Sequence, residues 1–156
     1  MYERSTEPKE TNRQIGPMFH QWLQEGALGV IPVDAATFTQ NDNDAILSGS
    51  DTFLAQFAKD HLSYRGSKGL DFVARFNGKY VIGEAKFLTD FGGHQNAQFN
   101  DAVALLKSKS SAAKVALLDG VLYIQGNNSM HRRITSTYKN NNIMSALVLR
   151  DFIYSL

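Results

Sequence analysis

The chain has 156 residues, and its 16 Lys and Arg against 15 Asp and Glu leave almost no net charge at pH 7. That length fits one domain that can bury a core, and the charge balance neither supports nor excludes a nucleic-acid partner. Because cysteine is absent, disulfide scaffolds and thiolate zinc sites are excluded, and a cytoplasmic location is expected. No apolar run approaches the ~20 residues of a membrane span, and the charged N-terminus is unlike a signal peptide.

The N-terminal part predicts an arm followed by a helix. Residues 1–14 are polar and are expected to form a flexible arm ahead of a single domain at residues 15–156. Pro17 suits the first turn of a helix, and apolar residues at helical spacing continue that helix to Gly26.

The next segment predicts a loop and a second helix. Residues 30–40 are expected to be irregular or weakly extended. The acidic run at residues 41–44 lacks the glycine and distal glutamate of an EF-hand, so a solvated turn is expected there. Ser50 is a good N-cap for a helix at residues 51–62, with Leu54, Phe57 and Ala58 facing inward.

The hairpin signal at Asn77-Gly78 is the most informative feature of the chain. It separates two apolar runs, which is typical of a two-residue type I′ turn. Counting outward from that turn places Asp71 directly opposite Glu84, with Cβ atoms about 5 Å apart. Lys86 lies on the same face as Glu84, because side chains alternate along a strand.

Two opposed carboxylates destabilise a strand pair unless a partner compensates them. A divalent cation with a lysine alongside is one such partner. The plainer alternative is a surface hairpin with an ordinary ion pair, worth only ~0–1 kcal/mol. Both strands are apolar on both faces near the turn, which is typical of central strands covered by helices. Only the end away from the turn carries acids, so we favour a ligand site there.

This arrangement resembles the active site of the PD-(D/E)XK nuclease superfamily, where one strand carries Asp and the next carries Glu or Asp, a spacer and Lys. The matching residues are Asp71, Glu84 and Lys86, with Ala85 as the spacer. Leu70 stands where the superfamily's name has proline.

Over residues 65–106 the chain is similar to type II restriction endonucleases in particular. The resemblance implies a restriction-endonuclease-like α/β/α core, Mg²⁺ as cofactor and double-stranded DNA as partner. It also implies that Asp71, Glu84 and the backbone carbonyl of Ala85 bind the metal. Lys86 would orient or deprotonate the attacking water, or contact the scissile phosphate. Two neighbouring carboxylates keep a lysine protonated, which favours the positioning role.

The rest of the chain completes the expected α/β fold. From the helix at residues 51–62 onward, the elements follow the order αββαββα, which fits a mixed central sheet flanked by helices. Those after the first hairpin are a helix at 94–108, a second hairpin at 114–125 with a turn at Asp119-Gly120, a polar loop at 126–138, and a helix at 143–154 capped by Asn142.

Basic and amide side chains near the predicted site are candidate DNA contacts. Gln and Asn can recognise adenine and Arg can recognise guanine, whereas Lys and Arg before the catalytic strand suit phosphate. Helix capping and plain surface exposure explain several of them equally well. The candidates are Arg65, Lys68, His94, Gln95, Gln98, Arg132 and Arg133. Many relatives add an acid from a preceding helix, for which Glu25 and Asp51 are candidates.

The favoured function is a magnesium-dependent, sequence-specific DNA endonuclease of the type II restriction class. A homodimer is expected, because cutting both strands of a palindrome needs two sites related by a two-fold axis. The alternatives are a structure-specific repair or junction nuclease of the same superfamily, and an inactive DNA-binding module. The sequence leaves open the recognition site, the cut position and the number of metal ions.

Overall fold

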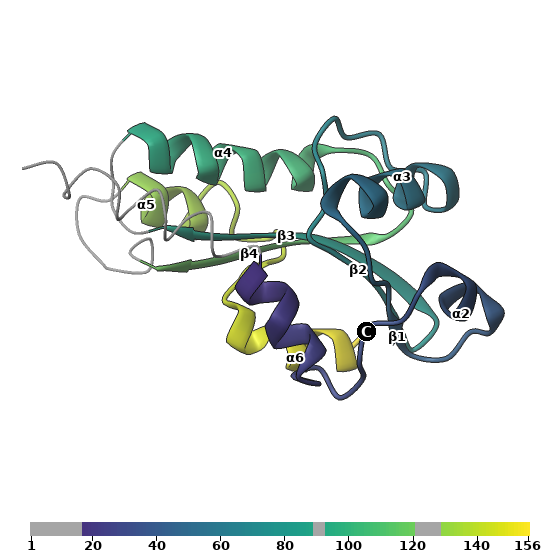
Figure 1. Ribbon diagram of the computed structural model, residues 1–156. Helices are drawn as coiled ribbons and strands as arrows, with labels where there is room; N and C mark the ends of the chain where they lie inside the picture. Colours follow the sequence, from purple (N-terminus) through teal and green to yellow (C-terminus); the bar gives the residue numbers. More distant parts are fainter. Residues whose placement is uncertain (1–16, 89–92, 121–128) are drawn as a thin grey trace, which may run out of the picture.

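A computed structural model describes residues 17–88, 93–120 and 129–156, and the predicted arm at residues 1–14 lies outside them. A five-stranded mixed sheet forms the centre, with strands in the order β1-β2-β3-β4-β5. Helices cover both faces (Figure 1), as the sequence predicts for an α/β fold. The strands are β1 Ala45–Ile46, β2 Phe72–Phe76, β3 Lys79–Leu88, β4 Ala113–Gly120 and β5 Ile143–Met144.

The hairpin of β2 and β3 has the predicted turn and register. Asn77 and Gly78 both have positive φ, at 52° and 74°, as a type I′ turn requires. The antiparallel pairing then runs without a bulge from the turn to Phe72 opposite Gly83. This hairpin places β3 at the centre of the sheet, with β4 on its other side.

The predicted turn at Asp119-Gly120 is wrong, because both residues belong to β4. That strand runs parallel to β3 and pairs Gly120 with Leu88. A Cβ at Gly120, whose φ is +105°, would collide with the backbone of Leu88. The glycine therefore permits close approach of two strands, not a turn. Residues 121–125, the other arm of the predicted hairpin, lie outside the described residues.

The first helices agree with the sequence except at one place. A helix occupies residues 17–24, and Gly26 follows it with φ +79°. Helix α3 (Asp51–His61) begins at Ser50, whose hydroxyl accepts the Phe53 N–H at 3.1 Å. The irregular segment expected at residues 30–40 is wrong in its second half, because Asp34 caps helix α2 (Ala35–Gln40) there.

Arg75 explains why α2 forms against the sheet. This side chain on β2 is only 2% exposed. It donates to the carbonyls of Phe38 at 3.0 Å and Asn43 at 2.9 Å, and its guanidinium lies over the Phe38 ring. One buried charge thus joins α2 and the loop after it to the sheet, through contacts that local sequence patterns do not reveal.

The later helices agree less well. Helix α4 (Gly93–Lys107) matches the prediction, and its apolar stripe is buried. The polar loop expected at residues 126–138 is wrong, because it contains helix α5 (Ser129–Thr135). Helix α6 (Ala146–Tyr154) is capped by Ser145, so the predicted cap at Asn142 is also wrong. The Asn142 carbonyl instead accepts the Ala116 N–H at 2.9 Å, and the next two residues form β5.

The sheet separates two helical layers. Helices α3, α4 and α5 lie on one face, and α6 and the helix at residues 17–24 lie on the other (Figure 1). Phe72 and Ala74 pack toward the second layer, and Val73 and Ile82 pack toward α3. Both faces of the hairpin are therefore covered, as predicted. None of the described helices is long and apolar enough to span a bilayer.

Candidate active site

Glu84 and Lys86 lie where β3 extends beyond the end of β2. The ladder between these strands ends at Phe72 and Gly83, whereas β3 continues beside β4 to Leu88. The Lys86 ammonium is 3.2 Å from the Glu84 carboxylate, so both side chains share the predicted face. Glu84 is only 7% exposed, so the carboxylate of this ion pair is buried. The edge of β3 beside it is partly open, because β2 has ended there.

Asp71 immediately precedes β2 and approaches the same edge of β3. Its N–H donates to the Gly83 carbonyl at 3.0 Å, and its carboxylate accepts the Ala85 N–H at 2.9 Å. The Asp71 carboxylate thus pairs with a backbone N–H of β3 that a longer β2 strand would otherwise pair with. The register stops one residue short of the predicted opposition, yet Asp71 interacts electrostatically with both Glu84 and Lys86.

Burial dominates the electrostatics of both acids. Loss of water raises the pKa of Glu84 to about 7, which Lys86 opposes and the nearby charge of Asp71 reinforces. Burial also raises the pKa of Asp71, against the Ala85 N–H bond and the positive charge of Lys86. A buried and a half-buried carboxylate therefore lie near one ammonium, and a further positive charge would stabilise their ionised forms.

Asp51, at the start of α3, is the nearer of the two candidate additional acids. Its carbonyl accepts the Leu70 N–H at 3.1 Å. A Cβ at Gly69 would lie 3.0 Å from its carboxylate, so the glycine lets Asp51 pack beside the hairpin. Its charge also acts on Asp71. Glu25, by contrast, is exposed and accepts a hydrogen bond from Gln21.

Three neighbours of the site were not predicted from the sequence. His20, from the helix at residues 17–24, acts on Asp71, and Asp101, from α4, acts on Glu84. Tyr64 is buried, and its hydroxyl donates to the Lys68 carbonyl at 3.3 Å; burial and the Glu84 charge raise its pKa. Helix and loop packing brings these residues in, so no sequence spacing links them to the hairpin. Within the described ranges, no three His, Cys, Asp or Glu side chains group as a metal site.

Of the two candidate phosphate contacts before β2, Lys68 lies beside the site. Lys68 is exposed and pairs with Asp101 at 3.6 Å, which links it to the helix next to Glu84. Arg65 is also exposed, and its N–H donates to the Lys109 carbonyl at 2.9 Å. Lys68 can therefore meet a ligand at the open edge of β3, whereas Arg65 is joined to the segment after the end of α4.

The other candidate contacts lie on α4 and α5. Gln95 is 2% exposed, Gln98 is half-buried, and the His94 side chain falls outside the described part. Arg132 is exposed on α5. Arg133 donates to Asn100 at 2.7 Å and stacks over the ring of Phe99, so it joins α5 to α4. The structure thus brings neither Gln95 nor Arg133 to an open surface near the acids.

Comparison with known families defines the class of protein. The model of the Tsp45I type II restriction enzyme family matches residues 1–156, which makes the chain a nuclease of a restriction system that binds DNA. The chain belongs to the Tsp45I type II restriction enzyme family. No curated protein and no solved structure gives a significant match.

Proposed function

We propose that this restriction endonuclease belongs to the PD-(D/E)XK superfamily and hydrolyses both strands of a specific DNA site in a magnesium-dependent reaction. Asp71, Glu84 and Lys86 are its catalytic set. The observation that supports this most is the shared edge of β3, where Asp71 accepts the N–H of Ala85, the residue between the ion-paired Glu84 and Lys86.

The donor set fits Mg²⁺. This ion prefers oxygen ligands and usually takes one or two carboxylates together with waters and substrate phosphate, so a third acid is not required. Asp71 and Glu84 supply two carboxylates with more negative charge than Lys86 offsets. In an extended strand the N–H and C=O of one residue point to the same edge. The Ala85 carbonyl therefore shares the edge at which its N–H meets Asp71, and is a third oxygen ligand in this proposal.

Each residue of the set has a separate role. A bound Mg²⁺ supplies a polarised water and neutralises charge on the phosphate. Asp71 is held in one orientation by the Ala85 N–H, and Glu84 is held by Lys86. Lys86, ion-paired with Glu84, orients the water or contacts the scissile phosphate.

DNA would approach the open edge of β3. Arg65 and Lys68 are the proposed phosphate contacts, since both are exposed and Lys68 pairs with Asp101 near Glu84. His94, Gln95, Gln98, Arg132 and Arg133 remain candidates for base or backbone contacts. A base contact by Gln95 requires its exposure, because its side chain is buried without DNA.

Plasmid cleavage tests the proposal. The protein with Mg²⁺ should give discrete bands, and chelation with EDTA should abolish them. Cutting confined to branched or nicked DNA would indicate a repair or junction nuclease instead. Binding without cleavage under any metal would indicate an inactive DNA-binding module.

The additional acid can be tested by a matched pair of variants. Asp51→Asn should raise the Mg²⁺ concentration needed for cleavage, because a carboxylate beside Asp71 attracts the cation. Glu25→Gln should leave that requirement unchanged. Equal effects of the two substitutions would exclude a specific role for Asp51.

A further inference from the structure

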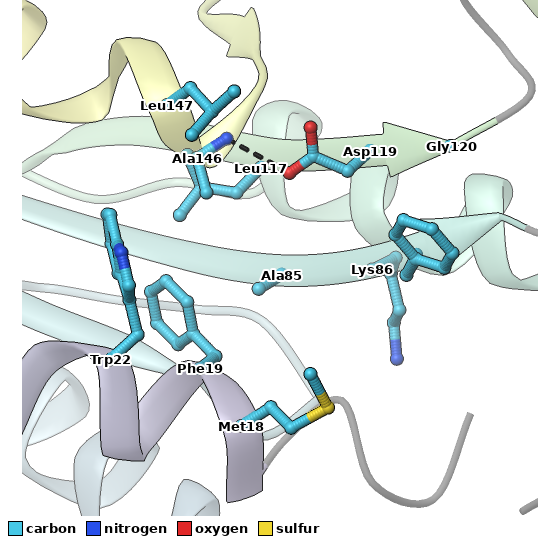
Figure 2. A pocket seen from close by; sticks show the side chains of 11 residues that line it. Met18, Phe19, Trp22, Ala85, Lys86, Leu117, Asp119, Gly120, Ala146 and Leu147 are labelled. Carbon is cyan, nitrogen blue, oxygen red and sulfur yellow. Dashed lines mark hydrogen bonds between the residues drawn. The ribbon is translucent and has the colours of Figure 1, made fainter. Parts of the chain in front are cut away.

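An apolar groove lies on the face of the sheet away from α3 and α4. It has a volume of about 400 Å³ and lies between the helix at residues 17–24 and α6. Ala85 and Leu117 form its floor, and Phe19 and Trp22 form one wall (Figure 2). The Lys86 side chain also lines it, so the groove adjoins the candidate active site.

Exposed apolar side chains surround this groove. Leu147, on α6, is 84% exposed, the highest value for a large apolar residue in the described part of the chain. Met18 is 59% exposed and Phe87 is 36% exposed, and all three line the groove. Val148 adds a further 48% exposed side chain next to Leu147. Clustered exposed apolar residues of this kind mark an interaction surface.

We propose that this surface, defined by Met18, Phe87, Leu147, Val148 and the groove, binds a second copy of the chain. A two-fold interface uses the same patch on both copies, so the patch must offer both a projection and a hollow. Leu147 projects at the rim of the hollow, as Figure 2 shows. The side chain of each copy can therefore enter the groove of the other.

Charge also favours a second copy. The chain carries a net charge of only +1, so two copies repel each other weakly. The exposed face of α6 beyond Leu147 carries one base, Arg150, and one acid, Asp151. Opposite charges on this face of α6 can pair with each other across a two-fold axis.

The position of the groove gives the pairing a functional consequence, which rests on the proposed function. One chain presents one Asp71–Glu84–Lys86 set, whereas double-strand cleavage needs two. Docking through a groove lined by Lys86 places the two sets on either side of one interface. The alkyl part of Lys86 then packs in the groove while its ammonium stays with Glu84.

The mass of the protein in solution tests the proposal. Without DNA, at tens of micromolar, the wild type should have the mass of two chains and Leu147→Glu the mass of one. Ile31→Glu is the matched control, because Ile31 is 59% exposed but does not line the groove; it should remain a dimer. Circular dichroism should show the same fold for all three. A monomeric wild type, or a Leu147→Glu variant that remains dimeric, would overturn the proposal.

A thiol probe places the interface without a charge change. The chain has no cysteine, so Leu147→Cys introduces a single reactive group. Its alkylation should slow as protein concentration rises, whereas that of Ile31→Cys should stay constant. Equal rates for both variants at all concentrations would contradict burial of Leu147 in the dimer.

Plasmid cleavage separates this inference from the proposed function. If the wild type linearises plasmid, monomeric Leu147→Glu should produce nicked circles first. Direct linearisation by the monomer would overturn the claim that this pair is the cutting unit. If no protein cuts DNA but the masses change as expected, the proposed function fails and the interface stands.

Discussion

At the scale of single residues, the site depends on carboxylates that are costly to ionise. Glu84 is buried beside the half-buried Asp71, and Lys86 is the ion-pair partner of Glu84. A metal-free protein therefore carries an electrostatic cost at this edge that a divalent cation would remove. Both the pH dependence of stability and the metal dependence of activity should reflect that cost.

The stability of the metal-free protein should fall as pH rises from about 4.5 to about 7. The pKa of Glu84 is about 7 in the folded protein, against an ordinary value of 4.5. The folded state therefore binds this proton more tightly than the unfolded state does, and the stability gained in this way is lost as pH rises through that range. Glu84→Gln should remove up to about 3 kcal/mol of that decline. Urea unfolding in EDTA at several pH values measures it.

Glu25→Gln is the control for that measurement and should follow the wild type at every pH. If Glu84→Gln shows the same decline as the wild type, burial does not raise the pKa of Glu84 in the folded protein.

Lys68→Ala tests the phosphate contact. If Lys68 meets phosphate, the variant should bind specific and random duplexes more weakly by the same factor. The slope of log affinity against log salt should also fall by about one unit. Titration in Ca²⁺ measures both. Lys59→Ala, at the far end of α3, should leave the slope unchanged, and equal slopes for Lys68→Ala and the wild type would exclude the contact.

At the scale of elements, the sequence predicted correctly those features that depend on interactions between residues close together in the chain. The Asn77-Gly78 turn fixes its own register, and the Ser50 cap needs only the first turn of α3. The Asp71–Glu84–Lys86 set could be predicted for the same reason, since it follows from counting along one hairpin. Its assignment as the catalytic set is still a proposal.

The errors arise where distant partners decide the structure. Gly120 approaches Leu88 on β3, and Asn142 joins β4, so turn and cap signals there lead to wrong predictions. Helix α5 is held to α4 by Arg133, in a segment whose composition predicted a loop. His20 and Asp101 reach the site through the packing of their helices. No spacing of residues in the sequence indicates that packing.

Gly120→Ala should destabilise the pairing of β3 with β4. The substitution combines left-handed backbone strain with a collision against Leu88. Gly26→Ala is the control, because Gly26 also has positive φ but has open space around it. Strain alone costs about 1–2 kcal/mol, so thermal unfolding should show a distinctly larger loss for Gly120→Ala. Equal losses would mean that the strands separate without cost at this point.

At the scale of the whole molecule, the two faces of the sheet that we propose to be functional meet at the end of β3. The face with α3 and α4 carries the acids, and the opposite face carries the apolar groove. Lys86 belongs to both, since it pairs with Glu84 and lines the groove. We therefore propose that β3 contributes both to catalysis and to the pairing of two chains.

The most direct test of the central claim is the rate of Mg²⁺-dependent plasmid cleavage by Lys86→Ala, compared with Lys79→Ala. Both lysines lie on β3, but Lys79 is at the hairpin turn, where its ammonium donates to the carbonyl of Leu156. Lys86→Ala should lower the rate by roughly 10²–10³-fold, as expected for loss of a group that stabilises the transition state. Lys79→Ala should cut at the wild-type rate. Near-wild-type cleavage by Lys86→Ala would contradict the proposed active site.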